Sequence, residues 1–256
     1  MLFTSFPAVG LATTFSATNG VTDSAAAGTA LATGEKTKNG AIGVLADQKT
    51  PVSSVATWAK DAGAAVGVAT SVSVDHATPA AFYAHVGGRN SYYTIGKHLI
   101  EANFDFYAGS DFMEPVGSGD LQKEGTLYAQ CEDAGYRLAR GVKDFSKKFK
   151  KGKKMILFQT EKASQKNNSS IPYAIDRKKG DMSLAEITRA GINFLSKDLS
   201  KGFFLMVEGG KIDWAGHAND AATNFREVID MDEAIKVAYE FYSQHPDETL
   251  IVVTAD

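Results

Sequence analysis

The segment VEGGKIDWAGHAND, residues 207–220, holds the densest group of side chains that can bind a metal ion. An apolar run ends at Glu208, two glycines follow, and Asp213 and His217 come next, four residues apart. Side chains at positions i and i+4 share one face of a helix, so this pair can point at one cation. A carboxylate with an imidazole suits zinc, whereas a lone carboxylate among waters suits magnesium.

A polar loop is the alternative interpretation of the same segment. Asn219 or Asp220 would then cap the helix that follows, as asparagine and aspartate commonly do. The Asp-x-x-x-His spacing by itself does not separate the two interpretations. The glutamate at a strand end and the Gly-Gly turn favour the metal site, because open α/β sheets bind ligands beyond the carboxyl ends of their strands.

Two further candidates follow apolar runs. Asp256 ends the run TLIVVTAD and is expected at the same sheet edge as Glu208, either as a metal ligand or as an ordinary cap between a strand and a helix. Thr78 precedes Pro79, and proline favours the first position of a helix. The Thr78 hydroxyl either caps that helix or binds a metal ion.

Asp23 and Ser24 precede the alanine-rich run AAAGTALATG, which reads as a helix closed by Gly34. Ser24 is therefore expected at a helix amino terminus, where unpaired amides and the helix dipole favour an anion such as a serine alkoxide or a phosphate. The small alanines would let this helix approach a packed sheet closely. A plain helix cap at Ser24 is the alternative.

Arg89 follows Gly87 and Gly88, beyond the helix that begins at Pro79. An arginine fork can hold two phosphoryl oxygens in a geometry that lysine cannot match. The alternative for Arg89 is an ordinary surface residue, and His85 is expected to pack within the helix.

The elements that must position these residues can be read from the hydrophobic pattern. Short apolar runs rich in β-branched residues alternate with longer runs whose apolar residues recur every three or four positions. Continuous apolar strands separated by helices are typical of a mostly parallel sheet with helices on both faces, so the sequence predicts a three-layer α/β/α sandwich. The expected strands are 64–74, 154–159, 202–208 and 248–256, and the expected helices are 53–63, 183–196 and 219–244, with Ser183 and Glu186 forming a capping box.

Bulk properties indicate one globular domain over residues 1–256, with insertions away from the sheet within about 88–180. The chain has 256 residues, and 44% of them are hydrophobic. Its net charge of −3 does not indicate binding to nucleic acid or to an anionic membrane. The lysine run 142–154 is interpreted as the solvated face of a helix, and NNSS at 167–170 as a loop. The single cysteine excludes an internal disulfide, and neither a signal peptide nor an apolar run of membrane-spanning length is visible.

Four motifs together resemble the alkaline phosphatase family, in the family's order and across nearly the whole chain. They are TDSAAAGTA (22–30), HATPAAFYAHVGGR (76–89), EGGKIDWAGHAND (208–220) and VVTAD (252–256). The tryptophan in IDWAGH is similar to that of certain bacterial members. The resemblance implies a phosphate monoesterase, an exported (periplasmic or secreted) location and a homodimer.

The resemblance also implies a role for each candidate. Ser24 would be the nucleophile that becomes phosphorylated, and Arg89 would hold the phosphate. Two zinc ions and one magnesium ion would be bound, the first zinc by Asp213 and His217, the second by Ser24 and Asp256, and the magnesium by Thr78 and Glu208. Asp23, His76 and Trp214 would surround these ligands and tune metal choice and phosphate release.

The family also has an initial strand that ends in an aspartate, and further histidine ligands after the TAD motif, which do not occur in residues 1–256. We therefore expect a central fragment of such a domain, incomplete at both termini, that binds zinc poorly by itself. Two alternatives to a phosphatase remain open. One is a non-catalytic fragment that binds phosphate or metal, and the other is a sulfatase or phosphomutase of the same superfamily, although Ser24 within DSAAAG disfavours the sulfatase.

Overall fold

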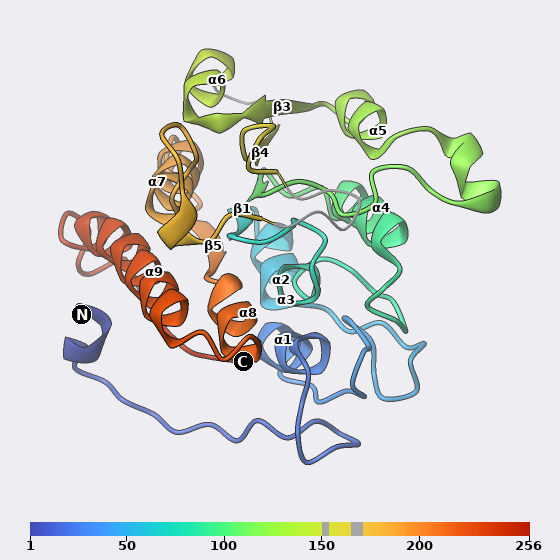
Figure 1. Ribbon diagram of the computed structural model, residues 1–256, viewed down its shortest axis with the longest axis horizontal. Coiled ribbons are helices and arrows are strands. Elements are labelled where there is room, and N and C mark those ends of the chain that lie inside the picture. The colour runs from blue at the N-terminus through green and yellow to red at the C-terminus, as the bar shows by residue number, and fades with distance from the viewer. Residues whose placement is uncertain (150–153, 165–170) are drawn as a thin grey trace.

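A computed structural model of the chain describes residues 1–149, 154–164 and 171–256. Its centre is a five-stranded sheet in the order β3-β4-β2-β1-β5, and all four strand pairs are parallel (Figure 1). The strands are β1 (Ala65–Thr70), β2 (Phe106–Gly109), β3 (Tyr136–Arg140), β4 (Lys154–Phe158) and β5 (Phe203–Glu208). The predicted α/β fold with a mostly parallel sheet is confirmed.

Successive side chains of a strand point to opposite sides of the sheet, and the central strands β2 and β4 are buried on both faces. In β4, Ile156 joins the hydrophobic core on one face, whereas Met155 and Leu157 join the core on the other. In β2 the alternation is the same, with Tyr107 on the first face and Phe106 on the second. Two apolar cores thus hold the sheet between layers of helices.

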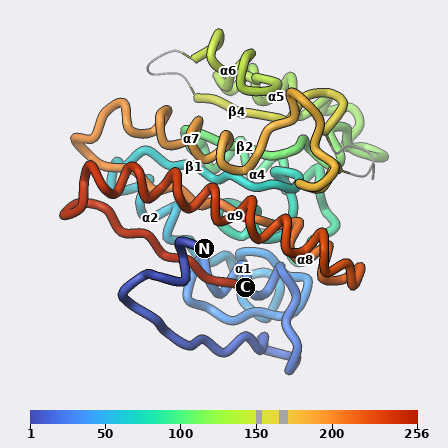
Figure 2. The backbone as a smooth tube through the Cα atoms, turned by 60° about the vertical axis from the view of Figure 1, so that its left-hand side comes forward, coloured from blue at the N-terminus to red at the C-terminus, as the bar shows by residue number. Residues whose placement is uncertain are grey.

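The helices form those two layers. α7 and α6 pack on one face, and α9 lies along α7, while α2, α4 and α5 cover the other face (Figures 1 and 2). Their bounds are α1 (Ser24–Thr33), α2 (Val55–Asp61), α3 (Ala77–Ala80), α4 (Tyr92–Ala102), α5 (Leu127–Asp133), α6 (Gly141–Lys148), α7 (Leu184–Leu195), α8 (Lys211–His217) and α9 (Ala221–Tyr242), with short 3-10 turns at Phe3–Ser5, Gly119–Glu124 and Ala174–Asp176.

Local signals place several helix ends correctly. The Ser183 hydroxyl accepts a hydrogen bond from Glu186 N at 3.2 Å, and the Glu186 carboxylate accepts one from Ser183 N at 2.9 Å, so the capping box is confirmed. Gly34 closes α1 with φ 80°, a left-handed conformation that favours glycine. In the lysine run, α6 buries Phe145 against Phe194 as the amphipathic pattern predicts, and residues 150–153 lie outside the described residues, as does the predicted loop at 167–170.

The run expected to form a strand at 248–256 does not do so. Residues 249–256 have no strand assignment, and Leu250 and Val252 are 86% and 73% exposed. Apolar, β-branched residues form a strand only where a neighbouring strand accepts and donates backbone hydrogen bonds, and in the described chain this run pairs with none. The segment instead returns to the region of α1, where Figures 1 and 2 show the end of the chain.

The stretch 88–180 contributes much of the sheet as well as surface elements. It holds β2, β3 and β4, whereas residues 110–126 form a loop and a 3-10 turn. β2 and β3 were not expected from the sequence, because β2 has only four residues and two arginines interrupt the apolar pattern of β3. No helix in the described ranges is long and apolar enough to cross a membrane.

Gly109 gives a test of how the strand ends are packed. A Cβ at this position would lie 2.8 Å from the carbonyl oxygen of Val72 and 3.1 Å from Val74 N, so backbone would have to move. We expect Gly109→Ala to lower the free energy of unfolding by about 1–3 kcal/mol. Gly20→Ala is the matched control, because no atom would approach its Cβ within 4 Å. Urea unfolding measures both, and equal stability of the two variants would contradict this packing.

Candidate active site

A cluster of carboxyl and hydroxyl groups lies at the carboxyl ends of β1 and β5. The two strands are in register so that Thr70 faces Glu208, and the Thr70 hydroxyl donates a hydrogen bond to the Glu208 carboxylate at 2.5 Å. Nearby, the Thr78 hydroxyl donates to the Asp256 carboxylate at 3.0 Å. The structure thus gathers Glu208, Thr78 and Asp256, which come from distant parts of the sequence.

The electrostatics of this cluster favour a cation. Removal from water, together with the negative charges of Asp256 and Asp213, raises the pKa of Glu208 to about 7, against the opposing hydrogen bond from Thr70. Burial and the charge of Asp213 also raise the pKa of Asp256. Like charges collected in a partly buried place repel one another, and a divalent cation is the group that would relieve them.

α8 follows the cluster directly and carries the predicted Asp-His pair. His217 Nε2 lies 3.3 Å from Asp213 Oδ1, and these side chains are 80% and 56% exposed. The turn before α8 requires a small residue, because a Cβ on Gly210 would lie 3.0 Å from the Glu208 carboxylate. Asp220 caps α9 by accepting a hydrogen bond from its Thr223 N, so the segment contains both the expected pair and the expected cap.

Ser24 is the first residue of α1, and the cap of this helix is Asp23. The Asp23 carboxylate accepts a hydrogen bond from Ala26 N at 3.0 Å, so the interpretation of Ser24 as the cap is wrong. An aspartate is as good a cap as serine, which leaves the serine free for another role. Ser24 is half-buried, and its hydroxyl has no hydrogen-bond partner within the part of the chain that the structure describes.

Asp23 also binds the predicted phosphate-binding arginine. Arg89 Nη1 donates to Asp23 Oδ2 at 3.1 Å, and Gly40 N donates to both carboxylate oxygens at 3.1 Å. Burial raises the pKa of Asp23, but the bonds from Ala26, Gly40 and Arg89 outweigh it and keep this pKa below its ordinary value. Arg89 is therefore held beside the start of α1 rather than being a free surface residue, with 26% of its side chain exposed.

α1 reaches the cluster through α3 and does not pack on the sheet edge as expected from its alanines. The closest approach is at Gly28, where a Cβ would lie 3.2 Å from both Ala81 Cβ and Thr78 Cα. The small residues of α1 thus permit contact with the helix that carries Thr78, because α3 lies between α1 and the sheet.

His76 and Trp214 flank the cluster, in contact with each other. Their rings meet edge to face with centroids 5.9 Å apart. His76, not Thr78, occupies the cap position of α3, since Thr78 already lies within the helix. Burial, and to a smaller extent the charge of Arg89, lowers the pKa of His76 to about 4, so its ring is neutral at ordinary pH. Its Nδ1 is buried without a partner in the described chain.

The candidate ligands share one region without forming a finished metal site. Over residues 1–149, 154–164 and 171–256, no group of three or more His, Cys, Asp or Glu side chains is arranged to hold a metal ion. Asp213 contacts His217, and Asp256 contacts Thr78, so these donors are turned toward each other. The donor types nevertheless fit the expected ions, because carboxylate and hydroxyl oxygens suit magnesium and the added imidazole suits zinc.

Comparison with known proteins decides the family. The family model "Alkaline phosphatase" matches residues 1–256, the whole chain. This chain belongs to the alkaline phosphatase family. Alkaline phosphatase 4 of Bacillus subtilis is 38% identical over 237 residues, covering 92% of this chain and 49% of that protein. Alkaline phosphatase of Escherichia coli is 33% identical over 275 residues, covering 92% of this chain and 58% of that protein.

Solved structures agree with this membership. The alkaline phosphatase of the Antarctic bacterium TAB5 matches with a TM-score of 0.82 at 34% identity, over 95% of this chain and 67% of that one. A mutant of the same enzyme with Mg bound matches with a TM-score of 0.81 at 32% identity, over 95% and 66%. The chain spans roughly half the length of the two alkaline phosphatases from Bacillus and Escherichia.

Three residues in or beside this candidate site were missed by the sequence analysis. Thr70 holds Glu208 at the end of β1, whereas the expected strand ran on to residue 74, so the sequence did not mark Thr70 as a strand end. Asp75, fully buried, accepts hydrogen bonds from Met113 N and lies beside His76 in sequence, but a buried aspartate has no local signature. Lys211 is buried at the start of α8, although lysine side chains are mostly exposed.

Asp75 gives the loop before α3 a predictable pH dependence. Burial, helped by the charge of Asp111, raises the pKa of Asp75 from 3.8 to about 7. The folded chain therefore keeps a proton that the unfolded chain releases, so the free energy of unfolding should fall as pH rises from about 4 to about 7. Asp75→Asn keeps an acceptor for Met113 N, and the free energy of unfolding of this variant should change less with pH. Urea unfolding at several pH values, with chelator present, measures the difference.

Asp133→Asn is the control for this measurement, because Asp133 is exposed at the end of α5. This variant should keep the pH dependence of the parent chain. If the free energy of unfolding of Asp75→Asn falls with rising pH as much as that of the parent chain, Asp75 is not the source of the pH dependence.

Proposed function

We propose that this chain carries the core of a metal-dependent phosphate monoesterase that works through a phosphoserine at Ser24. The observation that carries the proposal is the hydroxyl of Ser24 in the first turn of α1, unpaired within the described chain and next to the Asp23–Arg89 ion pair. The amino terminus of a helix favours the negative charge of a serine alkoxide and of an incoming phosphate. Membership in the alkaline phosphatase family supports the same reaction.

Arg89 is proposed to bind the phosphoryl group. A guanidinium has five N–H donors in a planar fork, and the contact with Asp23 engages only Nη1. Asp23 thus holds the fork in place while other donors remain for phosphoryl oxygens. Because Gly40 also anchors Asp23, the arginine is positioned before the substrate arrives.

The residues around Ser24 are proposed to hold the metal ions. Asp213 and His217 would bind one zinc, Ser24 and Asp256 the second, and Thr78 with Glu208 a magnesium ion. The Mg bound to a mutant of the TAB5 enzyme supports the presence of a magnesium site. When bound, these ions supply positive charge that favours the Ser24 alkoxide and stabilises the leaving oxygen. His76 and Trp214 would pack beside the magnesium ligands and limit their movement.

The reaction divides into two displacements at phosphorus. In the first, Ser24 Oγ loses its proton to solvent and forms a bond to phosphorus, while the bond from phosphorus to the ester oxygen breaks and the alcohol leaves with a proton from water. In the second, water attacks the phosphoserine, inorganic phosphate leaves, and the Ser24 hydroxyl is restored. Arg89 holds the phosphoryl oxygens through both steps, and few contacts to the leaving group are needed, which favours broad use of phosphate monoesters.

A second candidate is a chain that binds phosphate or metal without turnover. It is favoured by the absence, among the described residues, of a group of three or more acidic, cysteine or histidine side chains arranged around one ion. Titration of the chain 1–256 with zinc, followed by an assay of phosphate release, separates the two, since tight binding of two zinc ions with turnover would exclude this candidate. A sulfatase or phosphomutase receives no such support. Membership in the family also supports an exported homodimer.

Ser24→Ala tests the nucleophile. We expect this variant to lose phosphate release from a chromogenic monoester at alkaline pH, because no other hydroxyl occupies the first position of α1. A chelator should abolish the parent activity as well. The assay belongs on the longest natural chain that contains residues 1–256. Thr33→Ala, at the other end of α1, is the control and should remain active, whereas full activity of Ser24→Ala would refute the assignment.

Arg89→Lys tests phosphate binding. A lysine keeps the charge but loses the fork, so inhibition by inorganic phosphate should weaken roughly 10- to 100-fold, the effect of losing one charge-assisted hydrogen bond. Arg226→Lys is the matched control, since Arg226 is exposed on α9. Unchanged phosphate inhibition in Arg89→Lys would show that the arginine does not bind the anion.

A further inference from the structure

α8 is attached to the rest of the molecule by few side chains. It has seven residues, of which only Lys211 and Ala215 are buried. A helix of this length is not stable by itself, so its orientation depends on its contacts with neighbouring elements. α8 carries Asp213 and His217, and it begins three residues after Glu208 at the end of β5. Whatever fixes α8 therefore also fixes these side chains.

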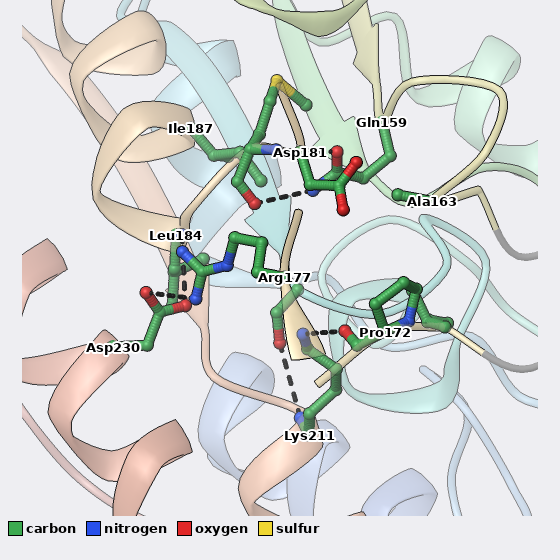
Figure 3. A pocket seen from close by; sticks show the side chains of 12 residues that line it. Gln159, Ala163, Pro172, Arg177, Asp181, Leu184, Ile187, Lys211 and Asp230 are labelled. Carbon is green, nitrogen blue, oxygen red and sulfur yellow. Dashed lines mark hydrogen bonds and ion pairs between the residues drawn. The ribbon is translucent and has the colours of Figure 1, made fainter. Parts of the chain in front are cut away.

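Lys211 makes the strongest of these contacts. Its side chain is only 7% exposed, and Nζ donates a hydrogen bond to the carbonyl oxygen of Pro172 at 2.8 Å, as Figure 3 shows. Nζ also lies 3.6 Å from Oε1 of Glu227 on α9, whose side chain is 2% exposed. Glu227 in turn accepts a hydrogen bond from Ala174 N. One ammonium group thus joins the start of α8 to α9 and to the loop before α7.

A second contact from α9 supports the same helix. Asn224 Nδ2 donates to the carbonyl oxygen of Ile212 at 2.8 Å. Both contacts hold the first turn of α8, whereas in its last turn only Ala215 is buried and His217 is exposed. The first turn is therefore the part that sets where the helix points.

A neighbouring ion pair in the same pocket provides a natural comparison. Arg177 Nη2 lies 2.8 Å from Oδ1 of Asp230, with side chains 20% and 11% exposed. This pair joins the loop before α7 to α9, as Lys211 does. Arg177, Asp230 and Lys211 all line the pocket drawn in Figure 3. Neither Arg177 nor Asp230 belongs to α8, so their loss would loosen the pocket without releasing the helix.

We propose that Lys211 is a positioning residue that fixes α8 on α9 and so holds Asp213 and His217 in place for metal binding. The inference rests on the proposed function. Lys211 does not touch the candidate ligands. It acts through the backbone of α8, because ligand groups must be held within about 0.5 Å of their productive geometry to bind a metal well. A purely structural role would instead make Lys211 equivalent to Arg177.

Zinc titration of folded variants separates these roles. The variants are Lys211→Met, Glu227→Gln, Lys211→Arg and, as matched control, Arg177→Met, all in the longest natural chain that contains residues 1–256. Circular dichroism and the midpoint of thermal unfolding of the metal-free forms show which variants are folded. Calorimetry with Zn²⁺ alone then gives the number and affinity of the sites. Glu227→Gln keeps the test available if Lys211→Met does not fold.

We expect Lys211→Met and Glu227→Gln to weaken zinc binding about 10- to 100-fold, the usual effect of removing a partner that orients metal ligands. Lys211→Arg should keep most of the zinc affinity of the parent chain, since arginine keeps the positive charge and an N–H donor. Arg177→Met should lower the unfolding midpoint but leave zinc affinity within about twofold of the parent. Zinc affinity that is unchanged in folded Lys211→Met, or reduced equally in Arg177→Met, would overturn the proposal.

A double variant shows whether Lys211 acts through Asp213. If it does, Lys211→Met should weaken zinc binding less in the Asp213→Asn background than in the parent chain, because there only the placement of His217 is left to lose. Fully additive losses would contradict the inference while leaving the proposed function standing. A parent chain that binds no zinc at all would instead overturn the proposed function together with the inference that rests on it.

Discussion

Repulsion among carboxylates at one edge of the sheet is the constraint on which the site depends. The parallel pairing of β1 with β5 brings Thr70 level with Glu208, and the returning end of the chain adds Asp256. Two hydroxyl donors offset part of the negative charge, yet burial, together with the charges of Asp256 and Asp213, still raises the pKa of Glu208 to about 7. Such an arrangement is costly for a protein that binds nothing there, and it is the environment in which divalent cations bind well.

The surrounding structure brings other groups to this edge. Gly28 lets α1 approach α3, so that Ser24 and Thr78 belong to helices in contact. Asp23 caps α1 and holds Arg89 with the same carboxylate, which ties the proposed nucleophile to the proposed phosphate-binding group. On the other side, α8 presents Asp213, and its buried lysine fixes the helix to α9. The site is therefore assembled by contacts between helices as much as by the sheet.

The sequence predicted those features that depend on local pattern. The long apolar strands and the Ser183–Glu186 capping box follow from side-chain periodicity and from hydrogen bonds between near neighbours. The prediction of a strand at 248–256 was wrong, because a strand needs a neighbouring strand to pair with and the local sequence does not show whether one is present. A cap at Ser24 was the alternative interpretation, whereas the cap of α1 is Asp23, one residue earlier. Aspartate and serine are equally good caps, so residue type alone does not separate these two neighbours.

Tertiary contacts were the part that the sequence could not predict. The packing of α1 on α3 rather than on the sheet depends on where α3 lies, which the alanines of α1 do not encode. The buried positions of Asp75 and Lys211 depend in the same way on partners far along the chain. For the candidate site, the motifs predicted which residues to consider, while their mutual contacts, such as Asp23 with Arg89, required the structure.

The central claim is that Ser24 accepts the phosphoryl group, and trapping the covalent intermediate tests it most directly. The longest natural chain that contains residues 1–256, loaded with zinc and magnesium, is mixed with a phosphate monoester carrying labelled phosphorus and quenched in acid, where phosphoserine is stable. Peptide mapping then locates the label. The account predicts label on the peptide that contains Ser24 and on no other. Label on a different residue, or the same label in Ser24→Ala, would contradict it.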